Sequence, residues 1–447
     1  MQSFGAQTEH SSSTPPSPSR LKSVQFLLRS LHSRNYRLFF MGHGISLIGT
    51  WMQQIAVSWL IYRLSGSSFL LGAVAFSAQF PAFLMAPVAG VIVDRCNRQR
   101  LFLITQICSM FQATLLAFFV LSGFIQIWQI IVLSSFLGFI NAFDMPLRQS
   151  LVVDLVEKKE DLSNAIALNS SLFNGARLIG PSIAGALVAS VGEGICFAIN
   201  AVSYLAVIAA ITAIRIPLNP SVKTNRHVFR ELKEGFDYVC HFIPIRNILA
   251  LFAITSFMGI PYVILLPIFT REILQGDART YGFLMAAIGI GALCATIYLA
   301  SRRNVLGLTK VISVSAAVFG FLVVCFAFSN NLIVSLILLF LAGFAIIAQI
   351  ASSNTILQTI VDNDKRGRVM SFYTMALMGS APLGGLAAGY IAAKIGVKAT
   401  LGICGLGCLV GAIVFARTLP AMHAIINPIY EKMGILREVG LSDKADE

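Results

Sequence analysis

The chain has 447 residues, of which 56% are hydrophobic and only 12% are charged, and its mean hydropathy is +0.79. This composition is too apolar for an ordinary soluble domain. The formal charge of +13 does not indicate nucleic-acid binding, because the basic residues form short clusters between apolar segments. The eight cysteines show no metal-ligand spacing, so we expect no metal and no other cofactor.

The chain begins with a polar stretch rich in serine and proline. Such a segment lacks the apolar surface that would offset the entropy of ordering, so we expect residues 1–34 to form a disordered cytoplasmic tail. The first long apolar run starts near Leu38 and is too long for the apolar part of a signal peptide. We therefore expect no cleavable leader.

Twelve apolar runs follow, each long enough to cross a hydrocarbon core of about 30 Å as a helix. The sequence predicts an all-α membrane protein with two pseudo-symmetric six-helix halves. The spans of the first half, residues 35–214, are 38–62, 70–93, 101–122, 126–147, 163–189 and 193–214. Those of the second half, residues 245–419, are 245–268, 280–301, 308–329, 332–359, 369–394 and 398–419.

Two polar segments complete the chain. The linker 215–244 contains FRELKEGFDYV, which favours an amphipathic helix at the cytoplasmic surface. Residues 420–447 are expected to form a cytoplasmic C-terminal tail.

The distribution of lysine and arginine predicts the orientation. With the N-terminus placed inside, the inner segments carry 27 of the 33 basic residues, the outer loops carry five, and Arg177 lies inside a helix. Cytoplasmic loops of membrane proteins carry such an excess. We therefore expect both termini to be cytoplasmic.

The halves also show a faint internal repeat. QSLVVD at 149–154 recurs as QTIVD at 358–362, and GPSIAG at 180–185 recurs loosely as APLGG at 381–385. Duplicated six-helix halves are a transporter design in which the solute site lies near the midplane and the halves rock around it. The sequence thus favours a transporter that works by alternating access.

The loop after the second span carries a glycine, an aspartate and three arginines in the order Gly90-x-x-x-Asp94-Arg95-x-x-Arg98-x-Arg100. This pattern resembles the signature of the major facilitator superfamily between helices 2 and 3, with Asn97 where a glycine is usual. The resemblance extends over roughly residues 34–419, as judged from where the quoted segments fall. It implies the major facilitator fold.

Further segments narrow the resemblance: ISLIGTWMQQIAVSWLIYRLSGSS (45–68), NAFDMPLRQSLVVDLV (141–156), LSNAIALNSSLFNGARLIGPSIAG (162–185) and RGRVMSFY (366–373). They are similar to the branch that contains enterobactin-type siderophore exporters and macrolide efflux pumps. Where that branch commonly has glutamine before the ISLIGTW run, this sequence has His43. The resemblance implies an exporter in a bacterial cytoplasmic (inner) membrane.

The predicted span 163–189 carries small residues and a proline at Gly175, Gly180, Pro181 and Gly185. They resemble a glycine-proline motif that the superfamily shows mainly in exporters. Small residues let helices approach closely, and proline loosens one turn. The alternative interpretation is helix packing without a role in transport.

Charged residues at the inner ends of the helices are candidates for a cytoplasmic gate. An aspartate at the membrane edge can accept from a helix N-terminus and pair with arginines, which stabilises one closed arrangement. The alternative is that these arginines only set the topology. The candidates are Asp94, Arg95, Arg98, Arg100, Arg148, Arg366 and Arg368.

Arg177 is the sharpest candidate for the cargo site, because a charge deep in a membrane span is costly. Ser170, Asn174, Arg177 and Pro181 follow steps of four, three and four, so they share one helix face. A guanidinium suits carboxylate, catecholate or phosphate oxygens, and an anionic cargo would fit. The alternative is a structural role, in which Arg177 pairs permanently with Asp144 or donates hydrogen bonds to backbone carbonyls.

Asp144 and His43 are candidates for coupling to protons. One helix face near the end of the predicted span 126–147 carries Asn141, Asp144 and Arg148. A carboxylate there can bind and release a proton as its surroundings change. As a gate ion pair, Asp144 would need no titration. His43 shares a face with Gln54 and titrates near neutral pH, although a lone membrane histidine also serves as a packing residue.

The sequence contains no Walker-type phosphate loop, H-E-x-x-H or G-x-S-x-G. We therefore expect a transporter and not an enzyme, driven by an ion gradient. The expected function is proton-coupled export of a small amphiphilic or anionic, siderophore-like metabolite by a monomer in the lipid bilayer. The alternatives are broad efflux of macrolide-like drugs and, from another class, a receptor or scaffold that translocates nothing.

Overall fold

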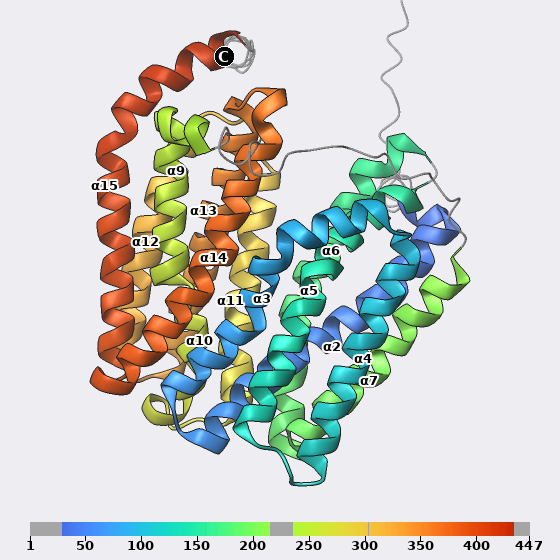
Figure 1. Cartoon of the computed structure of the whole chain (residues 1–447). Helices are drawn as coiled ribbons and strands as arrows, with labels where there is room; N and C mark the ends of the chain where they lie inside the picture. The colour runs from blue at the N-terminus through green and yellow to red at the C-terminus, as the bar shows by residue number, and fades with distance from the viewer. Residues whose placement is uncertain (1–28, 157, 215–235, 303, 433–447) are drawn as a thin grey trace, which may run out of the picture.

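The computed structural model describes residues 29–156, 158–214, 236–302 and 304–432, and within these ranges every regular element is a helix. Twelve helices are long and apolar enough to cross a membrane. The chain is therefore a multi-pass, all-α membrane protein, as the sequence predicts. The second-half helices lie on one side of Figure 1, yellow to red, and the first-half helices on the other, blue to green.

The first half comprises six long helices and two short 3₁₀ helices. In chain order they are η1 (Arg29–His32), α2 (Arg34–Ser65), α3 (Ser68–Arg95), α4 (Arg98–Leu121), α5 (Ile127–Leu155), η2 (Lys159–Asp161), α6 (Leu162–Val191) and α7 (Glu193–Ala213).

The second half has the same number of spans, the first of which is interrupted. Its elements are α9 (Ile243–Ile254), the π-helical η3 (Thr255–Gly259), α10 (Pro261–Ile268), the π-helical η4 (Phe269–Ile273), α11 (Ala278–Ala300), α12 (Leu308–Phe328), α13 (Leu332–Ile360), α14 (Asn363–Ile395) and α15 (Val397–Lys432).

The interruption of the seventh span follows from two of its prolines. Pro261 begins α10 and Pro267 lies within it. Proline has no backbone N–H to donate and its ring displaces the preceding turn, so the regular hydrogen-bond ladder cannot continue. The chain adopts π-helical turns on either side instead, and such turns often mark functional positions.

Capping residues define several of the helix ends. The side chain of Asn97 accepts from the backbone N–H of Arg100 and caps α4, which gives a physical role to the residue that replaces the usual glycine. Asn331 caps α13 in the same way. Gly66 ends α2 with φ at 60°, a left-handed conformation that glycine adopts without strain.

The N-terminal segment differs from the expected disordered tail of residues 1–34. Residues 29–32 form η1, and α2 already starts at Arg34. Arg29 pairs with Asp161 at 3.1 Å, and the hydroxyl of Ser30 donates to the side chain of Asn164. These polar contacts hold the segment against the start of α6. Residues 1–28 lie outside the described residues.

The C-terminal segment differs as well. We expected the last span to end at residue 419, but α15 continues to Lys432 despite Pro420 and Pro428. Met422, Ile426 and Tyr430 recur every four residues and are buried against the apolar core around α9 and α12. This stripe stabilises the extension. Residues 433–447 lie outside the described ranges.

The amphipathic helix expected in the linker is described only in part. Residues 236–241 are helical, and 215–235 lie outside the described residues.

One buried apolar cluster has members from both halves, each half has a further cluster of its own, and the halves meet mainly along two helix pairs. In the first half α2 packs on α6 and α7, α3 on α5, and α4 on α7. In the second half α11 packs on α13, and α12 on α13 and α15. Between the halves, α3 packs on α14 and α6 on α11, as Figure 1 shows.

We predict that Met422→Ala lowers the free energy of unfolding by about 2–5 kcal/mol, because it leaves a cavity in a buried site. Asn427→Ala, at an exposed position of the same helix, should change it by less than about 0.5 kcal/mol. Thermal and chemical unfolding of the purified protein in detergent checks both values. Equal stabilities for the two variants would mean that the extension of α15 does not contribute to the fold.

Candidate functional site

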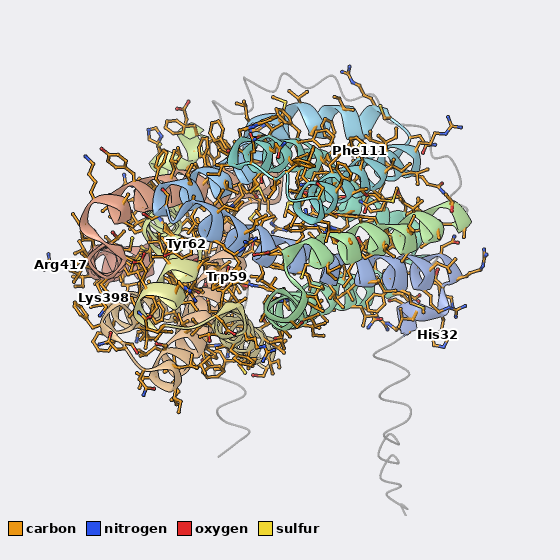
Figure 2. The ribbon with its side chains drawn as sticks, turned by 90° about the horizontal axis from the view of Figure 1, so that it is seen from below. His32, Trp59, Tyr62, Phe111, Lys398 and Arg417 are labelled. Atoms are coloured by element: carbon orange, nitrogen blue, oxygen red, sulfur yellow. The ribbon has the colours of Figure 1, made fainter. Side chains whose placement is uncertain are left out.

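The contacts between the halves gather toward one end of the bundle. This end, where α2 ends at Ser65 and α14 ends at Ile395, is called the closed end below. The hydroxyl of Tyr62 on α2 donates to Glu272 of the second half at 2.8 Å. Trp59 stacks on Tyr281 with ring centroids 6.1 Å apart. Figure 2 views the molecule from this end, with Trp59 and Tyr62 at the boundary between the halves.

Arg63, the residue after Tyr62, connects the end of α2 to the first half. Arg63 makes two hydrogen bonds to the buried carboxylate of Glu193 at the start of α7, at 2.8 and 3.1 Å. Adjacent residues of α2 thus contact opposite halves. A movement that separates the halves here must break the Tyr62 contact and can leave the Arg63 pair intact.

Glycines allow the backbones of the two halves to touch. A Cβ at Gly72 of α3 would lie 2.6 Å from the carbonyl oxygen of Gly385 on α14. A Cβ at Gly185 of α6 would lie 2.8 Å from the carbonyl oxygen of Ala278 at the start of α11. These positions have no room for a side chain.

The predicted glycine-proline motif of α6 lies largely at this contact. Gly180 faces α2 beside Trp51, the carbonyl of Pro181 faces Gly282, and Gly185 faces α11. Gly175 has open space at its Cβ position. Three of the four residues therefore pack helices together, and two of these three contact the opposite half.

Away from the closed end, several helices carry exposed polar side chains within their apolar spans, some midway and some toward the inner helix ends. A polar side chain facing lipid would be costly, so these residues mark a polar surface between the halves. They are Gln54 of α2, Asn141 and Gln149 of α5, Ser170 of α6, and Thr355 and Gln358 of α13. This set is called the central polar surface.

Arg177 lies near the middle of the 30-residue α6 and is half-buried. Its guanidinium carbon lies 5.8 Å from the centre of the Trp51 ring, a cation–π contact. It is also close enough to the hydroxyl of Tyr262, from the second half, for an electrostatic interaction. Within the described ranges no carboxylate pairs with it. The expected alternative, a pair with Asp144, is not formed.

Further aromatic rings pack against Trp51 and Tyr262. Trp51 meets Phe173 edge-on, with centroids 5.6 Å apart, and Tyr262 meets Phe319 in the same way at 5.7 Å. Asn174, predicted beside Arg177, donates to the carbonyl of Ser170 in its own helix. The site therefore combines one cation with apolar ring faces from both halves.

Asp144 lies inside the first half and has uncharged partners. Its carboxylate accepts from Gln106 at 2.5 Å and from Thr105 at 3.4 Å, both on α4. Arg148, one turn further along α5, interacts with it electrostatically. Asp144 keeps partial exposure, and the neighbouring Asn141 is exposed on the central polar surface.

His43 and Gln54 do not act together as their shared helix face suggested. His43 is buried, stacks on Phe39, and has its Nε2 atom 3.2 Å from Arg148. Gln54 is exposed on the central polar surface. His43 therefore belongs to the same cluster as Asp144, and Gln54 belongs to the central polar surface.

The predicted gate residues do not form one cluster among the described side chains. Arg98 pairs with Asp154 at 3.0 Å within the first half, and Arg148 contacts His43. Arg95 and Arg100 are exposed. The Nε of Arg366 is buried without a hydrogen-bond partner, Arg368 is half-buried, and the side chain of Asp94 lies outside the described set.

The sequence reasoning missed the aromatic residues of the site and the contact from Tyr62 to Glu272. Trp51 and Tyr262 look like ordinary apolar residues of membrane spans, and no local pattern pairs residues 210 positions apart. A signal was nevertheless present, because Glu272 is an acidic residue at the edge of an apolar span.

A family model described as "transmembrane secretion effector" matches residues 28–433. The chain belongs to this family, within the major facilitator superfamily. As a member of the superfamily it is a membrane transporter of the efflux or secretion type and not an enzyme, as the sequence indicated.

Two relatives and one solved structure agree with this assignment. The staphyloferrin A transporter of Staphylococcus aureus is 26% identical, over 85% of this chain and 95% of that protein. The multidrug efflux pump Tap of Mycolicibacterium fortuitum is 24% identical, over 80% and 88%. The inward-facing, occupied structure of a bacterial homologue of the lysosomal transporter Spinster has a TM-score of 0.67 at 13% identity, covering 87% and 97%.

We predict that Tyr62→Phe loosens the closed end while leaving each half folded. A hydrogen bond to a charged acceptor contributes about 1.5–3 kcal/mol, so the equilibrium between closed and separated arrangements should shift by about 10- to 100-fold. Pulsed electron paramagnetic resonance between spin labels at Ser68 and Lys394 reports the separation. Tyr36→Phe, which removes a buried hydroxyl within the first half, is the control. An unchanged distance distribution in Tyr62→Phe would contradict this role.

Proposed function

We propose that this transporter exports a small amphiphilic or anionic, siderophore-like metabolite by proton-coupled alternating access. The observation that carries the proposal is Arg177, a guanidinium at mid-helix without a carboxylate partner among the described residues, beside the Trp51 ring and near the Tyr262 hydroxyl of the other half. A half-buried cation at this depth is costly unless an anion compensates its charge. A cargo carboxylate, catecholate or phosphate would supply that anion.

Contacts at one end of the bundle support alternating access. The pairs α3–α14 and α6–α11 hold the halves together near Gly72 and Gly185, while the central polar surface lies away from them. With both termini cytoplasmic, as the distribution of basic residues favours, the closed end is the outer end. Cargo would then enter from the cytoplasm in the present arrangement and leave after the closed end opens.

Asp144 is the proposed proton carrier. It is the carboxylate that borders the central polar surface, and uncharged Gln106 and Thr105 hold it while Arg148 lies nearby. Movement of the halves changes the exposure of such a site, which alters its proton affinity. Each proton that crosses with a potential of 100 mV contributes about 2.3 kcal/mol.

The relatives support export as the direction of transport, and they are compatible with two classes of cargo. The staphyloferrin A transporter favours a siderophore, and the pump Tap favours broad drug efflux. The aromatic rings around Arg177 suit the apolar part of either cargo, and the guanidinium favours the anionic one. We place the protein as a monomer in a bacterial cytoplasmic membrane, with the lipid bilayer and protons as its partners besides the cargo.

Transport of two probes by the protein in liposomes tests the cargo class. We expect uptake of labelled staphyloferrin A into inverted vesicles under a pH gradient and little uptake of erythromycin. The opposite preference would support the drug pump. A protein that binds a probe but shows neither net uptake nor exchange would be a receptor or scaffold, which would overturn the proposal.

Arg177→Ala should reduce the uptake of the anionic probe by about 10- to 100-fold, because a hydrogen-bonded charge contributes about 1.5–3 kcal/mol. Arg417→Ala removes an exposed arginine on the surface of α15 and should leave uptake unchanged. Wild-type rates in Arg177→Ala would exclude this residue from the cargo site.

Asp144→Asn should abolish the dependence of transport on the pH gradient and leave exchange of labelled for unlabelled cargo intact, because exchange needs no net proton movement. The comparison uses the same vesicles with and without the gradient. Asp154→Asn, which alters a carboxylate paired at the end of the same helix, is the matched control. Retained acceleration by the gradient in Asp144→Asn would assign the proton to another residue.

A further inference from the structure

A histidine and an arginine connect α2 to α5 beside Asp144, in the interior of the first half. Nη1 of Arg148, on α5, lies 3.2 Å from Nε2 of His43, on α2. An arginine side chain can only donate hydrogen bonds, so His43 accepts through Nε2. A neutral imidazole carries one proton, and the bond to Arg148 therefore assigns that proton to Nδ1. His43 acts here as an uncharged acceptor.

The surroundings of His43 keep it in that role. The ring is buried and stacks on Phe39, with centroids 5.2 Å apart and planes inclined by 14°. Its Nδ1 atom is enclosed and has no hydrogen-bond partner among the described residues. A second proton on the ring would bury a charge beside a guanidinium, and it would turn Nε2 into a donor, which breaks the bond to Arg148. The imidazole is thus a fixed, neutral acceptor for the arginine.

Asp144 lies within reach of the same arginine but is not paired with it. The two residues are four positions apart on α5, and residues at this spacing are neighbours on a helix surface. No ion pair joins them among the described side chains. One carboxylate oxygen, Oδ1, accepts from Gln106 and Thr105. The other, Oδ2, has no hydrogen bond among the described residues and is not enclosed, so it is free to take a proton or the arginine.

The helix between the two residues contains a proline. Pro146 lies inside α5, between Asp144 and Arg148. A proline within a helix removes one backbone hydrogen bond and displaces the preceding turn, which here includes Asp144. The spacing of the two side chains can therefore change by a small bend of α5. Arg148 also has a long side chain that rotates about several bonds, so its move from one partner to the other needs no movement of a whole half.

We infer that Arg148 alternates between His43 and Asp144 according to the proton on the carboxylate. While Asp144 carries a proton it is neutral, and Arg148 stays on His43, as in the present arrangement. When Asp144 releases that proton to water at the central polar surface, its negative charge draws the guanidinium away from His43 and the two charges pair. Arg148 keeps all its protons throughout. His43 is a positioning residue for the arginine, and this inference rests on the proposed role of Asp144 as the proton carrier.

The other charged and titratable groups on the packed helices leave Arg148 with these two partners. From α4, Asp144 meets the uncharged Gln106 and Thr105, and from α7 it meets Tyr204, a phenol that is neutral near pH 7. The described groups that remain lie at helix ends or have other contacts: Arg34 and Arg37 of α2, Arg95 of α3, Arg29 with Asp161, Arg63 with Glu193, Arg98 with Asp154, and Arg177 of α6 beside Trp51.

The alternation connects proton release on α5 to α2. His43 lies on the same helix as Trp51 of the cargo site and Tyr62 of the closed end. The bond between Arg148 and His43 is a polar link between α5 and the first third of α2, and it breaks when the arginine moves to Asp144. Loss of the proton therefore changes the restraints on the helix that contacts both the cargo cation and the opposite half.

Infrared titration of the purified protein tests this alternation without cargo or transport. The C=O stretch of a protonated carboxylic acid reports Asp144, and its absence in Asp144→Asn assigns the band. His43→Leu removes the acceptor, which leaves Arg148 to the carboxylate alone and favours the ionised form. We expect the midpoint of the titration to fall by about one pH unit, a change of about tenfold in proton affinity. His43→Gln offers an amide oxygen in place of Nε2 and should restore the wild-type midpoint.

Two further variants give the test a direction and a control. Arg148→Leu should raise the midpoint by about one pH unit, because the ionised carboxylate then has no cation beside it. Tyr36→Phe, two helical turns before His43 on α2, removes a buried hydroxyl that donates to the carbonyl of Ala165 and should leave the midpoint unchanged. A purely structural role for His43 and Arg148 does not predict shifts of opposite sign.

The outcomes separate the alternation from the proposed function. A wild-type midpoint in His43→Leu would overturn it, and so would equal shifts in His43→Gln and His43→Leu, because the imidazole would then act through its own proton. If His43→Leu does not fold, an unchanged midpoint in Arg148→Leu still overturns it. A wild-type protein in which Asp144 shows no titrating band would instead remove Asp144 as the proton carrier, which is the part of the proposed function from which the alternation is derived.

Discussion

Hydrocarbon cannot hydrogen-bond or solvate a charge, and this constraint organises the whole molecule. Every span is a helix because a helix satisfies its own backbone, and most charges lie at helix ends, where Arg63 meets Glu193 and Arg98 meets Asp154. The charges that remain at depth are held by specific partners, with aromatic rings around Arg177 and a glutamine beside Asp144. The candidate functional residues Arg177 and Asp144 are therefore exceptions to the general exclusion of charge from the apolar spans.

The same constraint explains how two rigid halves form one transporter. Inside each half, polar groups such as Gln53 and Gln112 pair across helices and fix their arrangement. Between the halves, the contacts combine bare backbone at glycines, a buried apolar cluster with members from both halves, and the hydrogen bond of Tyr62. Contacts within a half thus include interlocked polar pairs, whereas those between the halves are mainly apolar. This difference favours rigid movement of the halves over deformation of either one.

Family membership and the residues of the site contribute different information. The relatives place the chain among efflux and secretion transporters, but identities of 24–26% leave the cargo open. The cargo argument depends instead on Arg177, whose charge requires compensation, and on Trp51 and Tyr262, which bring apolar surface from both halves. The coupling argument depends on Asp144, which lies in a separate cluster of the first half.

The sequence alone determined the class of protein, the number of spans and the depth of Arg177, because hydrophobic length and charge cost are local properties that each segment carries by itself. It could not decide which side chains meet. The sequence left a pair of Arg177 with Asp144 open, whereas helix packing turns Asp144 toward Gln106 and Arg177 toward Trp51. It also missed the continuation of α15, because the predicted apolar span ends at residue 419 and packing of Met422 and Ile426 extends the helix beyond it. Tertiary packing made these choices, because contacts between distant helices depend on how all twelve rotate and tilt together.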